Sequence, residues 1–276
     1  EVNVQNANGD VQEQISQIEY FIKKQVDVIV VVAGDCEALS DVMIKAREAG
    51  IKTVSYDRLI MNSGCDLYIS FDNTEVGRLM ARSLLENIPD GGDIFLIQGP
   101  LTDNNVKLIR EGIDETLAGS NLNVVYESNC VGWIAENAYT YTKEGLKQDR
   151  NVKGIICGND DLASQAFRAL SEERLAGKVC VTGQDGDLAA CQRIVEGTQE
   201  MTAFKSVEQE ASMAAKCAVL LGLGEEIEEV QDTAYDGTYN VPYLELQPIA
   251  VTKENMDEVI IKGGFHAKED VYLNVN

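Results

Sequence analysis

Short runs of Val and Ile alternate with helical stretches along most of this chain, and this alternation constrains the fold more than any other feature. Strands that alternate with helical patterns of about 10–15 residues predict βαβ units and a parallel sheet covered on both faces. The run VDVIVVVAG at 26–34 is almost continuously β-branched or apolar. Such a run is typical of a strand that is buried on both of its faces. We therefore expect an α/β protein with doubly wound parallel sheets.

The rhythm of strands and helices restarts once, after the run GDIFLIQG at 92–99. A chain of 276 residues predicts roughly two domains. We expect an N-terminal lobe of residues 1–101 plus 207–241 and a C-terminal lobe of residues 102–206 plus 242–276. With only four prolines and no low-complexity linker, the lobes should be joined by ordered crossings that act as a hinge.

The charge of the chain limits the class of ligand. It carries 46 acidic and 23 basic residues, a formal net charge of −23, which opposes binding to nucleic acid or anionic lipid. The seven cysteines include no C-x-x-C pair, and we interpret them as free buried thiols. The acidic segment GEEIEE at 224–229 is interpreted as a solvated loop. The net charge of −23 predicts a neutral or cationic ligand. We find no metal site or cofactor motif and expect no cofactor.

Polar side chains gather where the predicted strands end. In open parallel sheets, ligands bind just beyond the carboxyl ends of the strands. Carboxylates, amides and cations with several hydrogen-bonding edges could together satisfy a polyol. The single tryptophan, Trp133, lies in a loop after a strand, where its ring could pack against the C–H face of a sugar. The strand-end groups are Asp57-Arg58, Asp103-Asn104-Asn105, Asn159-Asp160-Asp161, Gln184-Asp185-Gly186-Asp187 and Lys205.

A simpler interpretation exists for several of these residues. Asp and Asn are common helix N-caps, so Asp35, Asn73, Asp161 and Asp187 could merely accept from backbone N–H groups. The case for a site therefore rests on the sets of polar residues at equivalent strand ends. The only histidine, His266, lies far from any nucleophile motif, and we interpret it as a surface or packing residue.

Catalytic signals are weak. The chain has no G-x-S-x-G, P-loop or G-x-G-x-x-G motif. Asp57 and Asp185 could form the carboxylate pair of a glycosidase, but that chemistry needs one of them protonated. The adjacent cations Arg58 and Lys205 favour the charged forms instead. We expect a site that binds its ligand and does not transform it, and so no enzyme.

A series of ordered motifs carries a resemblance to a known family. VQNANGDVQEQISQIE, SYDRLI, YISFDNTEVG, TDNNVKLIREG, GWIAENA, GNDDLAS, TGQDGDLAACQRI, GTQEMTAFK and GGFH occur in this order. They resemble the D-xylose-binding members of the type I periplasmic sugar-binding family, which feeds ABC transporters, over essentially the whole chain. The resemblance implies two Rossmann-like lobes, joined by three crossings, that close on a pyranose in the cleft.

The resemblance also implies the residues that contact the sugar. Asp57 and Arg58 would come from the first lobe. The second lobe would supply Asp103, Asn105, Trp133, Asn159, Asp185 and Lys205. The implied ligand is D-xylose or a related monosaccharide, and the implied partner is an ABC transporter permease or a membrane sensor kinase. The implied location is extracytoplasmic, in the periplasm or lipid-anchored at the outer face of the cell membrane.

The start of the chain departs from the family pattern. Family members begin with a βα unit whose strand lies in the middle of the first sheet, whereas EVNVQNANGD matches the second strand of the family. Without that unit, the first lobe would be incomplete, and its neighbouring strands would have unpaired backbone groups. A second chain or another segment would then have to complete the first lobe for tight sugar binding.

Two other functions fit the same fold class. The chain could be the effector-binding core of a sugar-responsive repressor, which would need a helix-turn-helix headpiece that is not seen in this sequence. It could less readily be a carbohydrate-active enzyme that uses the Asp57 and Asp185 pair. The leading hypothesis is an extracytoplasmic pentose-binding receptor that works by hinge closure.

Overall fold

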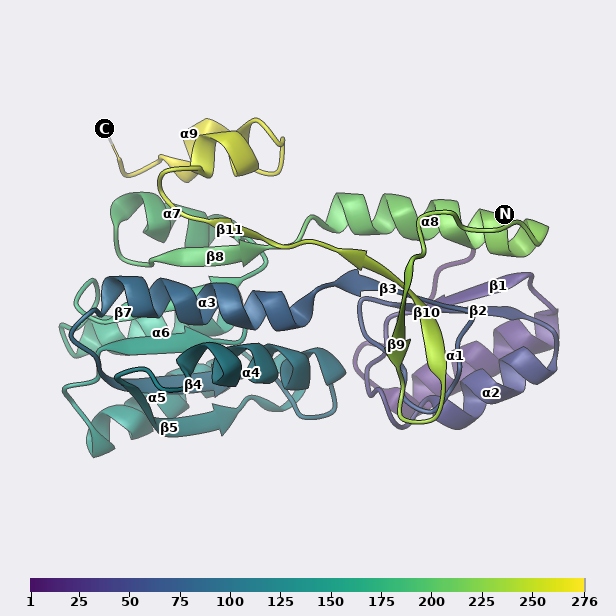
Figure 1. The fold of residues 1–276 in the computed structure, drawn as a ribbon, viewed down its shortest axis with the longest axis horizontal. Helices are drawn as coiled ribbons and strands as arrows, with labels where there is room; N and C mark the ends of the chain where they lie inside the picture. Colours follow the sequence, from purple (N-terminus) through teal and green to yellow (C-terminus); the bar gives the residue numbers. More distant parts are fainter. Residues whose placement is uncertain (276) are drawn as a thin grey trace. The chain divides into compact units, whose positions relative to one another are not determined.

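The computed structural model describes residues 1–275, and these divide into two compact units. Unit 1 consists of Glu1–Asp72, Thr102–Asn105 and Ser206–Gln247. Unit 2 consists of Asn73–Leu101, Val106–Lys205 and the segment from Pro248 onward. Each unit contains one β-sheet with helices against it (Figure 1).

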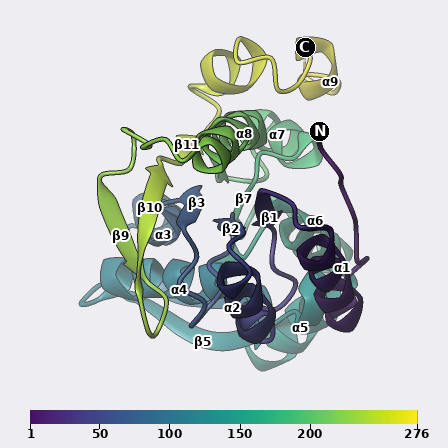
Figure 2. The same ribbon diagram turned by 90° about the vertical axis from the view of Figure 1, so that its right-hand side faces the viewer.

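Unit 1 is built on a five-stranded sheet in the order β1-β2-β3-β10-β9. All neighbouring strands are parallel except β9, which pairs antiparallel with β10 as a hairpin (Figure 2). Helices α1 and α2 enclose one hydrophobic core against the sheet, and α8 encloses another. The elements are α1 Val11–Lys24, β1 Val28–Val31, α2 Ser40–Glu48, β2 Lys52–Tyr56, β3 Leu67–Phe71, α8 Val207–Leu223, β9 Asp232–Tyr235 and β10 Asn240–Leu246.

Helix α1 shows how the local sequence sets an element of this unit. The Asp10 carboxylate accepts from the N–H groups of Gln12 and Glu13 and so begins the helix. Gln25 ends it in a left-handed conformation. Between these caps, Ile18 and its apolar neighbours recur at helical spacing and pack into the core beneath α1.

The first residues of unit 1 differ from the sequence-based expectation. The segment that matches the family's second strand forms no strand, and Val2 and Val4 in it are 88% and 85% exposed. β1 therefore lies at one edge of the sheet. Its outward-facing residues include Val30, which is 44% exposed.

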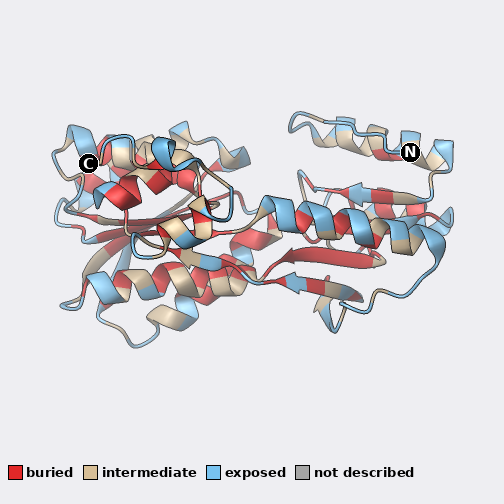
Figure 3. Cartoon of the chain, turned by 90° about the horizontal axis from the view of Figure 1, so that it is seen from above, coloured by how far each residue is buried: buried red, intermediate tan, exposed pale blue. Residues whose placement is uncertain are grey.

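Unit 2 is built on a six-stranded sheet in the order β11-β8-β7-β6-β4-β5. The strands are parallel except β11, which pairs antiparallel with β8. Every residue of β6 and β8 is buried, and Figure 3 shows exposed residues mainly on the outward faces of the helices. The elements are α3 Asn73–Asn87, β4 Gly92–Gln98, α4 Asn104–Leu117, β5 Leu122–Asn129, a 3-10 turn Val131–Trp133, α5 Glu136–Gln148, β6 Gly154–Cys157, α6 Asp160–Glu172, β7 Cys180–Gln184, α7 Leu188–Glu196, β8 Met201–Phe204, β11 Ile249–Val251, a π-helical turn Asp257–Ile261 and α9 Lys268–Val271.

The predicted α/β class with two doubly wound sheets is confirmed, with two differences in detail. Each sheet is mixed, because β9 and β11 run antiparallel to their neighbours. The boundary between the two units also differs from the predicted lobe boundary at residue 101. We expected the run 92–99 to close the first lobe, but β4 pairs with β5 and β6 in the sheet of unit 2. The change of unit at this point therefore falls between Asp72 and Asn73.

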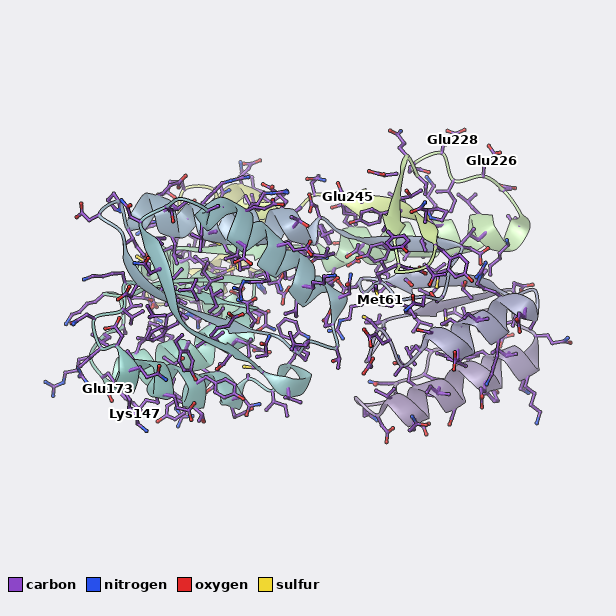
Figure 4. The ribbon with its side chains drawn as sticks, turned by 60° about the horizontal axis from the view of Figure 1, so that its bottom comes forward. Met61, Lys147, Glu173, Glu226, Glu228 and Glu245 are labelled. Carbon is purple, nitrogen blue, oxygen red and sulfur yellow. The ribbon has the colours of Figure 1, made fainter. Side chains whose placement is uncertain are left out.

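Other predictions from the sequence concern single residues. All seven cysteines are free, and six of them are buried, as expected. Glu226 and Glu228 lie on the exposed loop after α8 and extend outward in Figure 4, which confirms the solvated acidic loop. Across residues 1–275, no helix has both the length and the apolar character needed to cross a membrane.

Candidate functional site

Four of the predicted site residues meet in unit 1, and we call Asp57, Arg58, Asp103 and Asn105 the first cluster. Arg58 Nε lies 2.8 Å from Asp103 Oδ2 and 3.6 Å from Asp57 Oδ2. Asp103 is 3% exposed and Asn105 is 4% exposed. A carboxylate this deeply buried needs a cation or strong hydrogen bonds beside it, and Arg58 supplies the cation.

Two chain segments position the first cluster. Asp57 follows β2 directly and has a φ of 62°, so the chain turns sharply at the carboxyl end of this strand. The Asp57 carbonyl accepts from Ser70 Oγ at 2.7 Å and from Asn105 Nδ2 at 3.0 Å. The segment Thr102–Asn105 is held to the same unit by the hydrogen bond from Cys36 N–H to Thr102 O, at 3.0 Å. We expected Asp103 and Asn105 on the second lobe, but their contacts group them with unit 1.

The side-chain amide of Asn105 has a defined orientation. Its Nδ2 donates to the Asp57 carbonyl and, at 3.3 Å, to Asp57 Oδ1, both of which can only accept. The opposite atom, Oδ1, is therefore the amide oxygen. This oxygen is buried and has no hydrogen-bond partner among the residues that the structure describes. A buried acceptor without a donor is costly, and a ligand hydroxyl would satisfy it.

Tyr56, which precedes Asp57 in the chain, is a hydrogen-bond donor at neutral pH. Burial, followed by the nearby carboxylates of Glu210 and Asp57, raises the pKa of Tyr56 to about 12. The phenol therefore keeps its proton at neutral pH.

Three further predicted residues lie at strand ends of unit 2, and we call Asn159, Asp185 and Lys205 the second cluster. Lys205 follows β8 and its Nζ lies 3.5 Å from Asp185 Oδ1, with the Lys205 side chain 13% exposed and that of Asp185 40% exposed. Asn159 follows β6 after Gly158 and caps α6 by accepting from Leu162 N–H at 2.9 Å. The cap uses the Asn159 oxygen, and a contact of its Nδ2 donor with a ligand stays a prediction.

Trp133 lies at the end of the 3-10 turn in unit 2 and is partly buried. Its indole packs directly on Gly99, which follows β4. A Cβ atom at residue 99 would lie 2.3 Å from the ring, so only glycine permits this contact. The Trp133 ring is thus held at the carboxyl end of β4.

The helix N-cap interpretation fails at Asp35, Asp161 and Asp187. Asp35 accepts from the N–H groups of Glu37 and Ala38 within a turn, and α2 begins only at Ser40 with Leu39 at its N-cap position. Helix α6 is capped by Asn159 and not by Asp161. Asp187 occupies the N-cap position of α7, but its side chain makes no capping hydrogen bond.

The structure also shows two buried polar groups outside the predicted site residues. Gln98, which ends β4, was not singled out from the sequence, and Gln184, which ends β7, was named only among the strand-end groups. They are 1% and 3% exposed. The Oε1 atom of each is buried without a hydrogen-bond partner within residues 1–275. Their position at strand ends was the available signal. In the same described part of the chain, no group of three or more His, Cys, Asp and Glu residues could hold a metal ion.

Comparison with known proteins identifies the family of this chain. A model described as "Periplasmic binding protein domain" matches residues 1–226. The chain belongs to the periplasmic binding protein family. It is 44% identical to the D-xylose-binding periplasmic protein of Haemophilus influenzae over 276 residues, covering 98% of this chain and 82% of the relative. It is 40% identical to the Escherichia coli protein of the same name, covering 98% of this chain and 83% of the relative.

Solved structures of periplasmic binding proteins agree with the fold. An ABC transporter solute-binding protein of Clostridium phytofermentans with bound β-D-glucose has a TM-score of 0.88 and 27% identity, covering 98% of this chain and 90% of that one. These relatives are solute-binding proteins, which confirms the prediction that this family member binds its ligand and is not an enzyme.

Proposed function

We propose that this chain binds D-xylose outside the cytoplasm and presents it to the permease of an ABC transporter. The names of the two relatives at 44% and 40% identity support the sugar and the periplasmic location. The relative of known structure with bound β-D-glucose supports a monosaccharide ligand and a transporter partner. A membrane sensor kinase as the alternative partner, and hinge closure on the sugar, remain predictions from the sequence.

The single observation that best supports the proposal is the unpartnered Oδ1 of Asn105. This atom is buried beside Asp57 and Arg58, and a sugar hydroxyl that donates to it would remove the cost of leaving it unpaired. The same hydroxyl could accept from an Arg58 N–H group. A neutral polyol suits this arrangement, since Arg58 already balances much of the charge of Asp57 and Asp103.

Isothermal titration with D-xylose tests the proposal. We expect saturable binding at one site per chain. The variant Asn105→Ala removes both the acceptor and the donor to Asp57, and we expect it to weaken binding by about tenfold or more. The matched control is Asn104→Ala, because Asn104 is the neighbouring amide and is not part of the first cluster.

Two results would contradict the proposal. Absence of binding by the unmodified chain would argue against a sugar receptor. Equal affinities of the Asn104→Ala and Asn105→Ala variants would remove the first cluster from the sugar site. Parallel titrations with D-glucose and D-ribose test the choice of sugar. Tighter binding of D-xylose than of either sugar supports the assignment to D-xylose, and similar affinities support only a monosaccharide ligand.

A further inference from the structure

The turn after β7 holds a backbone conformation that amino acids with side chains rarely adopt. Asp185 has a φ of 99° and Gly186, which follows it, has a φ of 77°. Residues with a Cβ atom adopt a positive φ rarely, and a φ of 99° lies outside the usual left-handed region, so local contacts are needed to hold it. A Cβ at residue 186 would also lie 2.7 Å from the Phe204 ring, so glycine is required there. The groups that fix this turn therefore fix the backbone from which the Asp185 carboxylate extends.

Asp160 holds the N–H side of this turn. Its Oδ2 accepts from the backbone N–H of Gly186 at 3.0 Å and from that of Asp187 at 3.1 Å. The Thr202 hydroxyl donates to the same oxygen at 2.7 Å, and Gln199 Nε2 donates to Oδ1 at 3.0 Å. Asp160 is fully buried at the start of α6, so this anchor is rigid.

His266 holds the opposite, carbonyl side of the same turn. Its Nε2 lies 2.8 Å from the Gly186 carbonyl oxygen. Since a carbonyl can only accept, Nε2 carries the proton. The sulfur of Cys191 is a weaker donor to this oxygen at 3.4 Å. The His266 ring also packs beside Phe265, at 4.5 Å between ring centroids, and Phe265 packs on Phe204 at 4.9 Å.

We propose that His266 is a positioning residue for ligand binding, which clamps the Gly186 peptide so that Asp185 keeps its strained conformation beside Lys205. This inference rests on the proposed function, because Asp185 is taken as a sugar contact. His266 is the only histidine of the chain, and its hydrogen bond joins the C-terminal segment to a turn 80 residues earlier. Asp160 and His266 thus fix the two sides of one peptide group, immediately after the predicted ligand residue.

The test compares two substitutions in titrations with D-xylose. His266→Leu removes the donor and keeps an apolar side chain. His266→Gln keeps an N–H donor at a similar reach from the backbone. We expect His266→Leu to weaken binding by about fivefold to tenfold, and His266→Gln to restore most of the affinity. Equal affinities of the two variants would overturn the inference.

A second substitution shows whether His266 acts through Asp185. In an Asp185→Asn background, His266→Leu should cause little further loss of affinity, since the group that it positions is already altered. The same loss in both backgrounds would mean that His266 acts elsewhere.

A measurement without ligand separates this inference from the proposed function. In nuclear magnetic resonance measurements on the free protein, His266→Leu should speed hydrogen exchange at the amides of Gly186 and Asp187, whereas His266→Gln should largely preserve their protection. Unchanged exchange in His266→Leu would overturn the clamp whether or not D-xylose binds. Failure of the unmodified chain to bind D-xylose, with the exchange rates as expected, would contradict only the proposed function.

Discussion

Replacement of Arg58 by Met should leave the buried carboxylate of Asp103 without its cation. Met has a similar length but no cation, and Asp103, at 2.8 Å from Arg58 Nε, is only 3% exposed. Removing one member of a buried ion pair typically costs about 3–5 kcal/mol, because the other charge remains buried without compensation. The hydrogen bond from Arg58 Nη1 to the Ala33 carbonyl, at 3.0 Å, is lost as well. We therefore expect the local stability of unit 1 to fall by about 3–5 kcal/mol.

The double variant Arg58→Met with Asp103→Asn separates the charge effect from a packing effect. Asn keeps an oxygen that accepts from the Asn105 N–H, as Asp103 Oδ1 does at 3.0 Å, but it carries no charge. If the loss in Arg58→Met comes from the unpaired carboxylate, the double variant should recover all but about 1–2 kcal/mol of it.

Hydrogen exchange at the amides of β2, measured by mass spectrometry, is the suitable assay. The single tryptophan lies in unit 2, so its fluorescence does not report on unit 1. The two units need not unfold together, so one global free energy of unfolding would not isolate this site. The reasoning is refuted if protection of β2 changes by less than about 1 kcal/mol in Arg58→Met, or if the double variant is as unstable as the single one.

Three further predictions concern unit 2 and the thiols. Burial raises the pKa of Asp160 to about 8, against 3.8 for a free carboxyl. Between pH 3.8 and pH 8 the folded protein therefore holds a proton on Asp160 that the unfolded chain does not. The free energy of unfolding should fall as the pH rises through this range. Asp160→Asn should flatten this fall in denaturation measured from pH 4 to 9, and an equal slope would contradict it. Gly99→Ala should displace the Trp133 indole and change its emission spectrum, and an unchanged spectrum would refute the contact. Burial raises the pKa of Cys36 and Cys180 to about 12, so a thiol reagent at pH 8 should label the native protein slowly and all seven cysteines in urea.

Hydrophobic runs predicted where β1 and β4 lie along the chain, but not how far β1 is buried. The run at 92–99 becomes β4. The β-branched run at 26–34 becomes β1, which lies at a sheet edge with Val30 44% exposed and so is not buried on both faces as expected. The strands β9, β10 and β11 were not predicted. β9 and β11 have only four and three residues, most of which are at least partly exposed. The sheet that β4 joins was also predicted differently. Strand pairing is set by contacts far apart in sequence, and no local pattern indicates which sheet a buried strand enters.

The rule that ligands bind at the carboxyl ends of parallel strands selected residues that do lie at strand ends, and their contact with a ligand stays a prediction. It placed Asp57 and Arg58 after β2 and Lys205 after β8, where the structure has them. It did not reveal that Asn159 also caps a helix, which depends on where α6 begins. It could not reveal the role of His266, because that residue contacts Gly186 across 80 positions of the chain. Groups that position a site from a distance follow from the folded contacts and have no local signal.

The two clusters share an arrangement that explains how so acidic a chain can suit an uncharged ligand. In each, a carboxylate that follows a strand lies within 4 Å of a cation: Asp57 with Arg58 at 3.6 Å, and Asp185 with Lys205 at 3.5 Å. The formal charge of −23 therefore belongs mostly to the rest of the chain, where Glu226 and Glu228 are examples (Figure 4). Paired groups offer donors and acceptors of fixed direction without a large local field. An anionic ligand would gain little beside these carboxylates, whereas a polyol can use both partners of each pair.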